Sequence, residues 1–117
     1  MTPAQIALAL QEAVDKARPR LARIEEGASA RHPAPGKWSP REIIGHLIDS
    51  AQNNHGRFVR AQLSDDLVFP GYAQDDWVRL AHYQDQRWSE IVDFWSAYNR
   101  HLAVVIRHLD SQSLKNV

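Results

Sequence analysis

Histidines are the residues of this chain best suited to chemistry, because it has six of them and no cysteine. The absence of cysteine excludes disulfides, thiolate zinc sites and cysteine nucleophiles. An imidazole can bind a divalent transition metal, and it exchanges a proton near neutral pH. The six are His32, His46, His55, His82, His101 and His108.

Spacing excludes a metal chelate formed within one helix. Nine positions separate His46 from His55, which is more than about 13 Å along a helix axis. Seven positions separate His101 from His108, or about 10.5 Å. Zinc–nitrogen bonds are only ~2.0–2.1 Å long, and the chain contains no H-x-x-x-H, H-x-x-E-H or HExxH motif. A metal site would therefore have to gather side chains from different helices, such as His46 with His101, His82 or His55.

Other catalytic signatures are absent. The chain has no GxSxG elbow, no Walker loop and no GxGxxG motif, so it offers no standard nucleophile or phosphate cradle. The acidic pairs Asp65-Asp66 and Asp75-Asp76 are interpreted as loop and helix-cap residues.

The stretch WSPREIIGHLIDS, residues 38–50, predicts a helix start. Ser39 is a good N-cap, Pro40 suits the first helical position, and Glu42 completes a capping box. An apolar stripe follows at helical spacing, and Trp38 can pack onto it as a hydrophobic staple.

His46 lies at the edge of this stripe, beside Ser50 and Asn53 on a helical wheel. A polar patch bordering a core face suits a site between two helices. It equally suits a boundary histidine that bonds a backbone carbonyl, and spacing does not decide between these interpretations.

Two further long helices are predicted. The first begins at the N-cap Thr2, is kinked or broken near Arg18 by Pro19, and ends at Gly27. The other has apolar residues at near-heptad spacing from 91 to 109, begins by Tyr83 or before, and ends near 110–111.

The segments between these helices are predicted to be loops. Residues 27–37 lack periodicity and are rich in Pro, Gly and Ala, with a solvated His32. Residues 64–77 form a long connection in which Phe69, Tyr72 and Trp77 pin the loop to the helices.

At 117 residues the chain is expected to be a single domain, residues 1–117. Lysine plus arginine equal aspartate plus glutamate at 14 each, so it has no general attraction for nucleic acid or anionic membrane. No signal peptide and no apolar span are found. These features favour a cytoplasmic protein without nucleic-acid or membrane partners.

The run KWSPREIIGHLIDSAQNNHGRFVRAQ resembles the DinB-like (DinB/YfiT-type) family of metal-dependent proteins. Its signature is a Trp-Ser/Thr, a capping Glu, and then His-Leu with a following Asp. FPGYAQDDWV and NRHLAVVIRHL, residues 69–78 and 99–109, are similar to its later connection and third helix.

This resemblance implies an all-α, antiparallel helical bundle of four helices, often homodimeric, with a divalent metal such as zinc or nickel near one end. His46 matches the ligand on the second helix. The other two ligands would be an H-x-x-x-H pair on a fourth helix, which residues 1–117 do not contain. Some relatives transfer low-molecular-weight thiols.

Two hypotheses follow. In the first, a truncated DinB-like chain without a complete three-histidine site acts as a helical dimer or interaction module, because three helices leave apolar faces for a second copy to cover. In the second, it is a metal-dependent enzyme, a thiol transferase or hydrolase, with a site rebuilt around His46. Whether the chain is an enzyme, and its small-molecule substrate, stay open.

Overall fold

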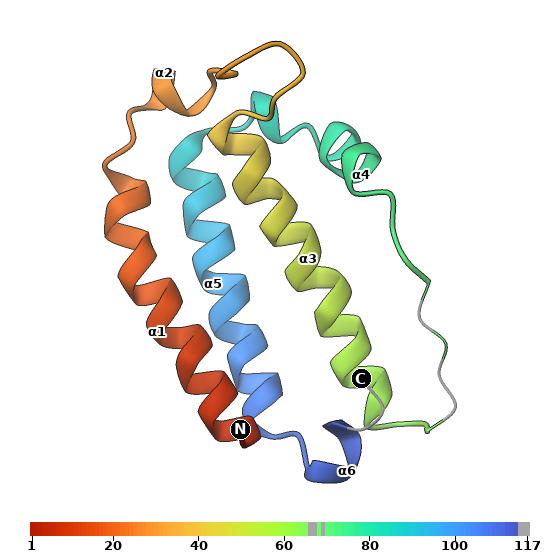
Figure 1. Ribbon diagram of the computed structural model, residues 1–117. Coiled ribbons are helices and arrows are strands. Elements are labelled where there is room, and N and C mark those ends of the chain that lie inside the picture. The colour runs from red at the N-terminus through yellow and green to blue at the C-terminus, as the bar shows by residue number, and fades with distance from the viewer. Residues whose placement is uncertain (66–67, 69, 115–117) are drawn as a thin grey trace.

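The computed structural model describes residues 1–65, 68 and 70–114, and all regular structure within these residues is helical. Three long helices form the body, and short helical segments lie in the connections (Figure 1). The elements are α1 (Pro3–Ala22), α2 (Glu26–Ser29), α3 (Pro40–Ala61), α4 (Gln74–Ala81), a 3-10 turn η1 (Tyr83–Asp85), α5 (Trp88–Arg107) and α6 (Ser111–Leu114).

Helix α1 begins as predicted but ends earlier. The Thr2 hydroxyl accepts from the Gln5 backbone N–H, and the Gln5 side chain accepts from the Thr2 backbone N–H. Pro19 lies inside the helix, which continues to Ala22, so of the predicted kink or break near Arg18 the break is wrong. The predicted end at Gly27 is also wrong, because that glycine lies in the separate short helix α2.

Helix α3 confirms the prediction for its start. The Ser39 hydroxyl accepts from the Glu42 backbone N–H, and the Glu42 carboxylate accepts from the Ser39 backbone N–H. Ser39 is fully buried, and its hydroxyl also donates to Gln84 Oε1 at 2.5 Å. The helix start is therefore tied to η1, which lies 45 residues further along the chain.

The connection between α3 and α5 contains more structure than the sequence indicated. Trp77 lies within α4, and Tyr83 belongs to η1, so the third long helix begins at Trp88 and not by Tyr83. His82 ends α4 in the left-handed conformation, with φ of 57°. A carboxylate from α2 fixes the start of α5, because both oxygens of Glu26 accept from the Trp88 backbone N–H.

Tyr72 pins the connection to α3, as predicted. Its hydroxyl lies 2.8 Å from Ser50 Oγ, and its ring packs edge-on against Trp77. Phe69, predicted to share this role, lies outside the described residues.

Helix α5 lies between α1 and α3 (Figure 1). Ion pairs join Arg18 to Asp93 and Asp15 to Arg100, so α1 runs antiparallel to α5. Early residues of α3 pack on early residues of α5, and His55 contacts Tyr98 further along, so α3 and α5 run parallel. The bundle is thus antiparallel between α1 and the other two helices, and the crossover with α4 makes the parallel pair possible.

The core is built where both outer helices pack on α5. Ile91 is 1% exposed and Val14 is 1% exposed, which places them among the most deeply buried side chains. Both belong to a buried cluster that also includes Trp88, whose indole N–H donates to the Leu21 carbonyl. Burial of such large apolar side chains contributes about 1.5–3 kcal/mol each to folding.

Gly45 in α3 allows the crossover to approach closely. A β-carbon at this position would overlap the ring of Tyr83 in η1. The same helix contains a second glycine, Gly56, where a β-carbon would meet no described atom within 4 Å.

We therefore expect opposite effects from two alanine substitutions in α3. Gly45→Ala should lower the free energy of unfolding by about 1–3 kcal/mol, because the ring of Tyr83 must move. Gly56→Ala should raise it by about 0.5–1 kcal/mol, because alanine favours the helix. Urea unfolding monitored by circular dichroism measures both, and equal effects of the two changes would contradict the close approach at Gly45.

Candidate functional site

His46 lies near the start of α3, packed against the tryptophan that precedes the helix. The Trp38 and His46 rings have centroids 5.2 Å apart and planes inclined by 41°. Nδ1 of His46 is buried and has no hydrogen-bond partner among the described residues. The interpretation of His46 as a boundary histidine bonded to a backbone carbonyl therefore does not hold for this nitrogen.

Asp49 follows one helical turn after His46 and is more deeply buried, with 5% of its surface exposed. The Tyr83 hydroxyl donates to Asp49 Oδ1 at 2.6 Å, across the close approach that Gly45 permits. Within the described part of the chain, the second carboxylate oxygen, Oδ2, is buried without a partner. Two orphaned polar atoms thus lie on side chains three residues apart, a spacing that puts neighbours on one helix face.

Burial raises the pKa of the Asp49 carboxyl above its ordinary value, while the hydrogen bond from Tyr83 and the charge of a protonated His46 lower it in part. The pKa of Tyr83 is also raised, by its own burial and then by the hydrogen bond and charge of Asp49. Tyr83 is therefore a protonated donor at any ordinary pH.

The residues around His46 do not form a complete metal site. A catalytic zinc site uses three protein ligands and leaves one position open. His46 and Asp49 supply two candidate donors, and nowhere in residues 1–65, 68 and 70–114 do three His, Asp or Glu side chains group around a possible ion. The three-ligand set that the resemblance implies therefore does not fit these residues alone.

The other histidines are distributed away from this pair. His55 and His101 lie together, with ring centroids 5.2 Å apart, but His55 is nine residues along α3 from His46. His82 is exposed at the end of α4, with Nδ1 4.0 Å from an oxygen of Asp85. The structure therefore places His55 and His101, two of the predicted partners of His46, beside each other and not beside His46.

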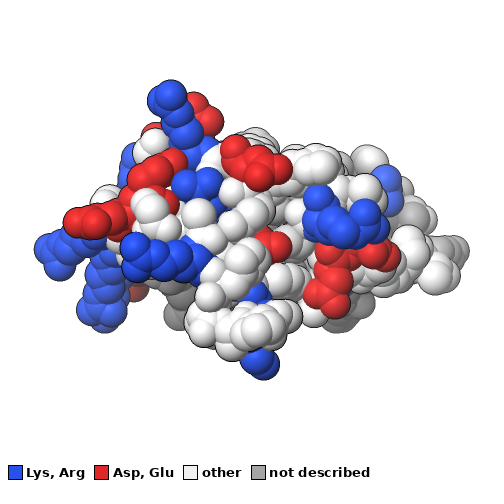
Figure 2. Space-filling view, turned by 90° about the horizontal axis from the view of Figure 1, so that it is seen from above, with Lys and Arg blue, Asp and Glu red and all other residues white. Residues whose placement is uncertain are grey.

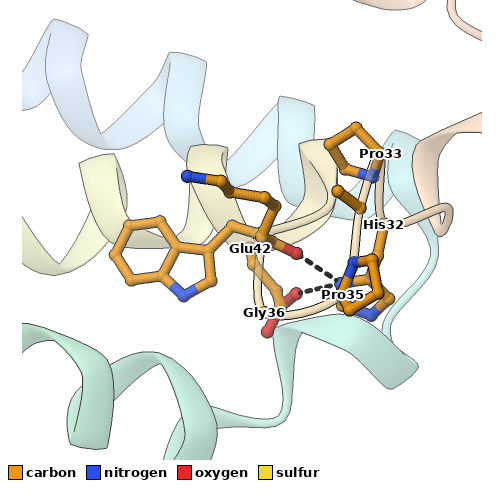
Figure 3. A pocket seen from close by; sticks show the side chains of 8 residues that line it. His32, Pro33, Pro35, Gly36 and Glu42 are labelled. Atoms are coloured by element: carbon orange, nitrogen blue, oxygen red, sulfur yellow. Dashed lines mark hydrogen bonds and ion pairs between the residues drawn. The ribbon is translucent and has the colours of Figure 1, made fainter.

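A shallow hollow of about 670 Å³ lies where the 32–38 loop meets the start of α3. His32 is exposed, as predicted, and its Nδ1 also lies 2.8 Å from the Lys37 carbonyl and 3.3 Å from Glu42 Oε1 (Figure 3). On the face seen from above, acidic and basic side chains are interspersed without a large area of one sign (Figure 2).

An apolar groove of about 420 Å³ opens between α1 and α3, with α5 as its floor. Leu47 lies on its α3 wall and is 40% exposed. The lining contains no charged residue. It consists of Ile6, Leu10, Ala13, Val14, Leu47, Ser50, Ala51, Asn54, Phe58, Trp95, Asn99, Leu102 and Ile106.

Sequence reasoning named His46 as a site residue but not Asp49 or Tyr83, although Asp49 is the Asp of the family signature. Asp49 carried a usable signal, because a carboxylate three residues after a histidine shares its helix face. Tyr83 carried none, because its contact with Asp49 spans 34 residues and depends on the path of the crossover.

Comparison with known proteins identifies the family. The family model of the DinB superfamily matches residues 9–116, which is nearly the whole chain, so the chain belongs to the DinB superfamily. No curated protein and no solved structure matches. Among the described residues no helix is both long and apolar enough to cross a membrane.

Asp49 should give the protein a distinctive dependence of stability on pH. The Asp49 carboxyl binds its proton more tightly in the folded state than in the unfolded state. Its protonation therefore increases the free energy of unfolding as the pH falls from the raised pKa to the ordinary pKa of aspartate. Asp49→Asn keeps an acceptor for the Tyr83 hydroxyl but lacks the titration. We expect the free energy of unfolding of Asp49→Asn, measured in urea, to exceed that of the wild type most at neutral pH, and the difference to shrink on acidification.

Two further variants complete this test. Asp76→Asn changes an exposed carboxylate on α4, and its plot of the free energy of unfolding against pH should run parallel to that of the wild type. Tyr83→Phe removes the donor to Asp49 and should cost about 1–3 kcal/mol. If the plots of the wild type and Asp49→Asn run parallel at every pH, the raised pKa of Asp49 is contradicted.

Proposed function

Starting from membership of the DinB superfamily, we propose that this chain acts as a helical interaction module that forms a homodimer through the groove between α1 and α3. The observation that carries the proposal is the open apolar groove itself. Its walls and floor are the inward faces of the three long helices, and Leu47 stands 40% exposed on one wall. Contiguous apolar surfaces of this kind commonly mark interaction sites.

The chemistry of the groove supports a second copy of the chain as its occupant. The lining is uncharged, so a charged partner would lose hydration without gaining ion pairs. The chain has a formal net charge of zero, so two copies do not repel one another over long range. Two identical apolar stripes related by a two-fold axis would cover each other.

Asn54 supports the two-fold arrangement further. It is exposed on the α3 wall, among apolar lining residues. Its side-chain amide carries both donors and an acceptor, so an asparagine on a two-fold axis can bond to its own copy. A single asparagine in an apolar seam fixes register and oligomeric state in coiled coils.

A second candidate function is a metal-dependent enzyme of the thiol transferase or hydrolase type, with its ion at His46. The orphaned Nδ1 of His46 and Oδ2 of Asp49 favour it, because buried polar atoms are normally partnered. Imidazole and carboxylate are suitable donors for zinc or nickel. The described residues supply no third ligand to this pair, so this candidate ranks second.

The dimer is tested by light scattering on the purified chain, with two variants of α3. Leu47 and Val59 are equally exposed, at 40% and 39%, but only Leu47 lines the groove. We expect the wild type to be a dimer at micromolar concentration. Leu47→Glu should weaken association at least ten- to hundredfold, because each of the two copies loses a leucine whose full burial contributes about 1.5–3 kcal/mol. Val59→Glu should leave association unchanged.

A monomeric wild type, or equal weakening by both glutamate substitutions, would rule out the groove as the interface. Circular dichroism of each variant checks that the helices are retained, so that loss of association is not loss of folding.

Metal content distinguishes the two candidate functions. After passage through metal-free buffer, we expect the wild type to hold well under one zinc or nickel per chain by elemental analysis. His46→Ala should then make no difference, and His108→Ala serves as a control on an exposed histidine. A stoichiometric metal lost only in His46→Ala would establish the second candidate in place of the first.

A further inference from the structure

His55 on α3 and His101 on α5 form a cluster that takes no part in the groove or the surroundings of His46. We propose that these two histidines bind a transition-metal ion that prefers imidazole ligands, such as Cu²⁺, Ni²⁺ or Zn²⁺. The proposal is independent of the dimer and of any metal at His46. It rests on the separation of the two rings, the partner of His55, and the rigidity of the helices that hold them.

The ring separation fits a shared ion. With metal–nitrogen bonds of ~2.0–2.1 Å and a near-tetrahedral angle, the centroids of two ligating imidazoles lie about 5 Å apart. The centroids of His55 and His101 are 5.2 Å apart. Their planes are perpendicular, at 90°, which is no obstacle because each ring can rotate about its metal–nitrogen bond.

Tyr98 is placed to orient His55 as a ligand. Its hydroxyl lies 2.9 Å from His55 Nδ1, so Nδ1 is occupied and Nε2 is the nitrogen available to an ion. In the tautomer that ligates through Nε2, Nδ1–H donates to the phenol oxygen. Ligating histidines almost always donate their other ring N–H to an oxygen, usually of a carboxylate, a backbone carbonyl or water, and the Tyr98 hydroxyl would take that place here.

The backbones on both sides are fixed by packing. Ala51 on α3 and Leu102 on α5 belong to one buried cluster, and Phe58 and Tyr98 pack against it. The site is also accessible, because His101 is exposed and His55 is half-buried. No third acidic or histidine side chain joins the pair within the described residues, so water completes the coordination.

This donor set selects a class of ion. Neutral imidazoles suit copper, nickel and zinc, whereas magnesium and calcium prefer oxygen ligands. Affinity should follow the usual order for nitrogen ligands, in which copper binds more tightly than nickel or zinc.

Isothermal titration calorimetry of the intact chain with NiCl₂ tests the proposal. We expect one exchangeable ion per chain and no response to MgCl₂. His101→Ala should weaken binding about a hundredfold, because the second ligand no longer acts at high effective concentration. His101 is exposed, so this change leaves the core intact, and His55→Ala should reproduce the loss.

Two controls separate this site from others. His108 is an exposed histidine at the end of α5, and its Nδ1 lies 2.8 Å from the Val104 carbonyl. The variant His108→Ala should bind nickel normally. His46→Ala should also bind normally. Unchanged nickel binding in His101→Ala, or loss of binding in His46→Ala or His108→Ala instead, would overturn the proposal.

Discussion

The architecture depends on one helix, α5, against which both α1 and α3 pack. Ion pairs between Arg18 and Asp93 and between Asp15 and Arg100 flank the contact with α1. The two outer helices lie on either side of α5 and leave an uncharged groove between them (Figure 1). The same arrangement that builds the core therefore exposes an apolar stripe, and the proposed dimer is the means of covering it.

The parallel direction of α3 and α5 imposes a second constraint, because the chain must return along the bundle before α5 can begin. Contacts that hold this crossover converge on the early turns of α3. The ring of Tyr83 fits against Gly45, its hydroxyl bonds Asp49, and Gln84 accepts from Ser39. Since Asp49 and His46 each keep one buried atom without a partner in the described structure, this end of the bundle combines tight packing with incomplete polar satisfaction. Such groups cost stability, and they commonly occur where a ligand or solvent completes the set.

Sequence reasoning succeeded where the determinants are local. The capping boxes at Thr2 and Ser39 and the apolar stripes of the long helices follow from spacing within a few residues. It failed where the chain folds back on itself. The start of α4 lies in the predicted loop 64–77, η1 lies where the third long helix was predicted to have begun, and the first helix was predicted to continue beyond Ala22.

The same distinction applies to the sites. His46 was singled out from its own helix, but Tyr83 reaches Asp49 only through the crossover. His55 was weighed as a partner for His46, whereas its neighbour is His101 on a helix parallel to its own. Spacing within one helix argued against chelates along that helix but could not show which helices would lie side by side.

The central claim is that the groove between α1 and α3 joins two copies with Asn54 near the two-fold axis, and the absence of native cysteine allows a direct measurement. A disulfide requires Cα atoms about 4.4–6.8 Å apart, and a two-fold axis near Asn54 would bring the two copies of this residue that close. Asn54→Cys should therefore form a covalent dimer on mild oxidation, while Val59→Cys should stay monomeric under denaturing electrophoresis. Efficient cross-linking through Val59→Cys, with none through Asn54→Cys, would contradict the account.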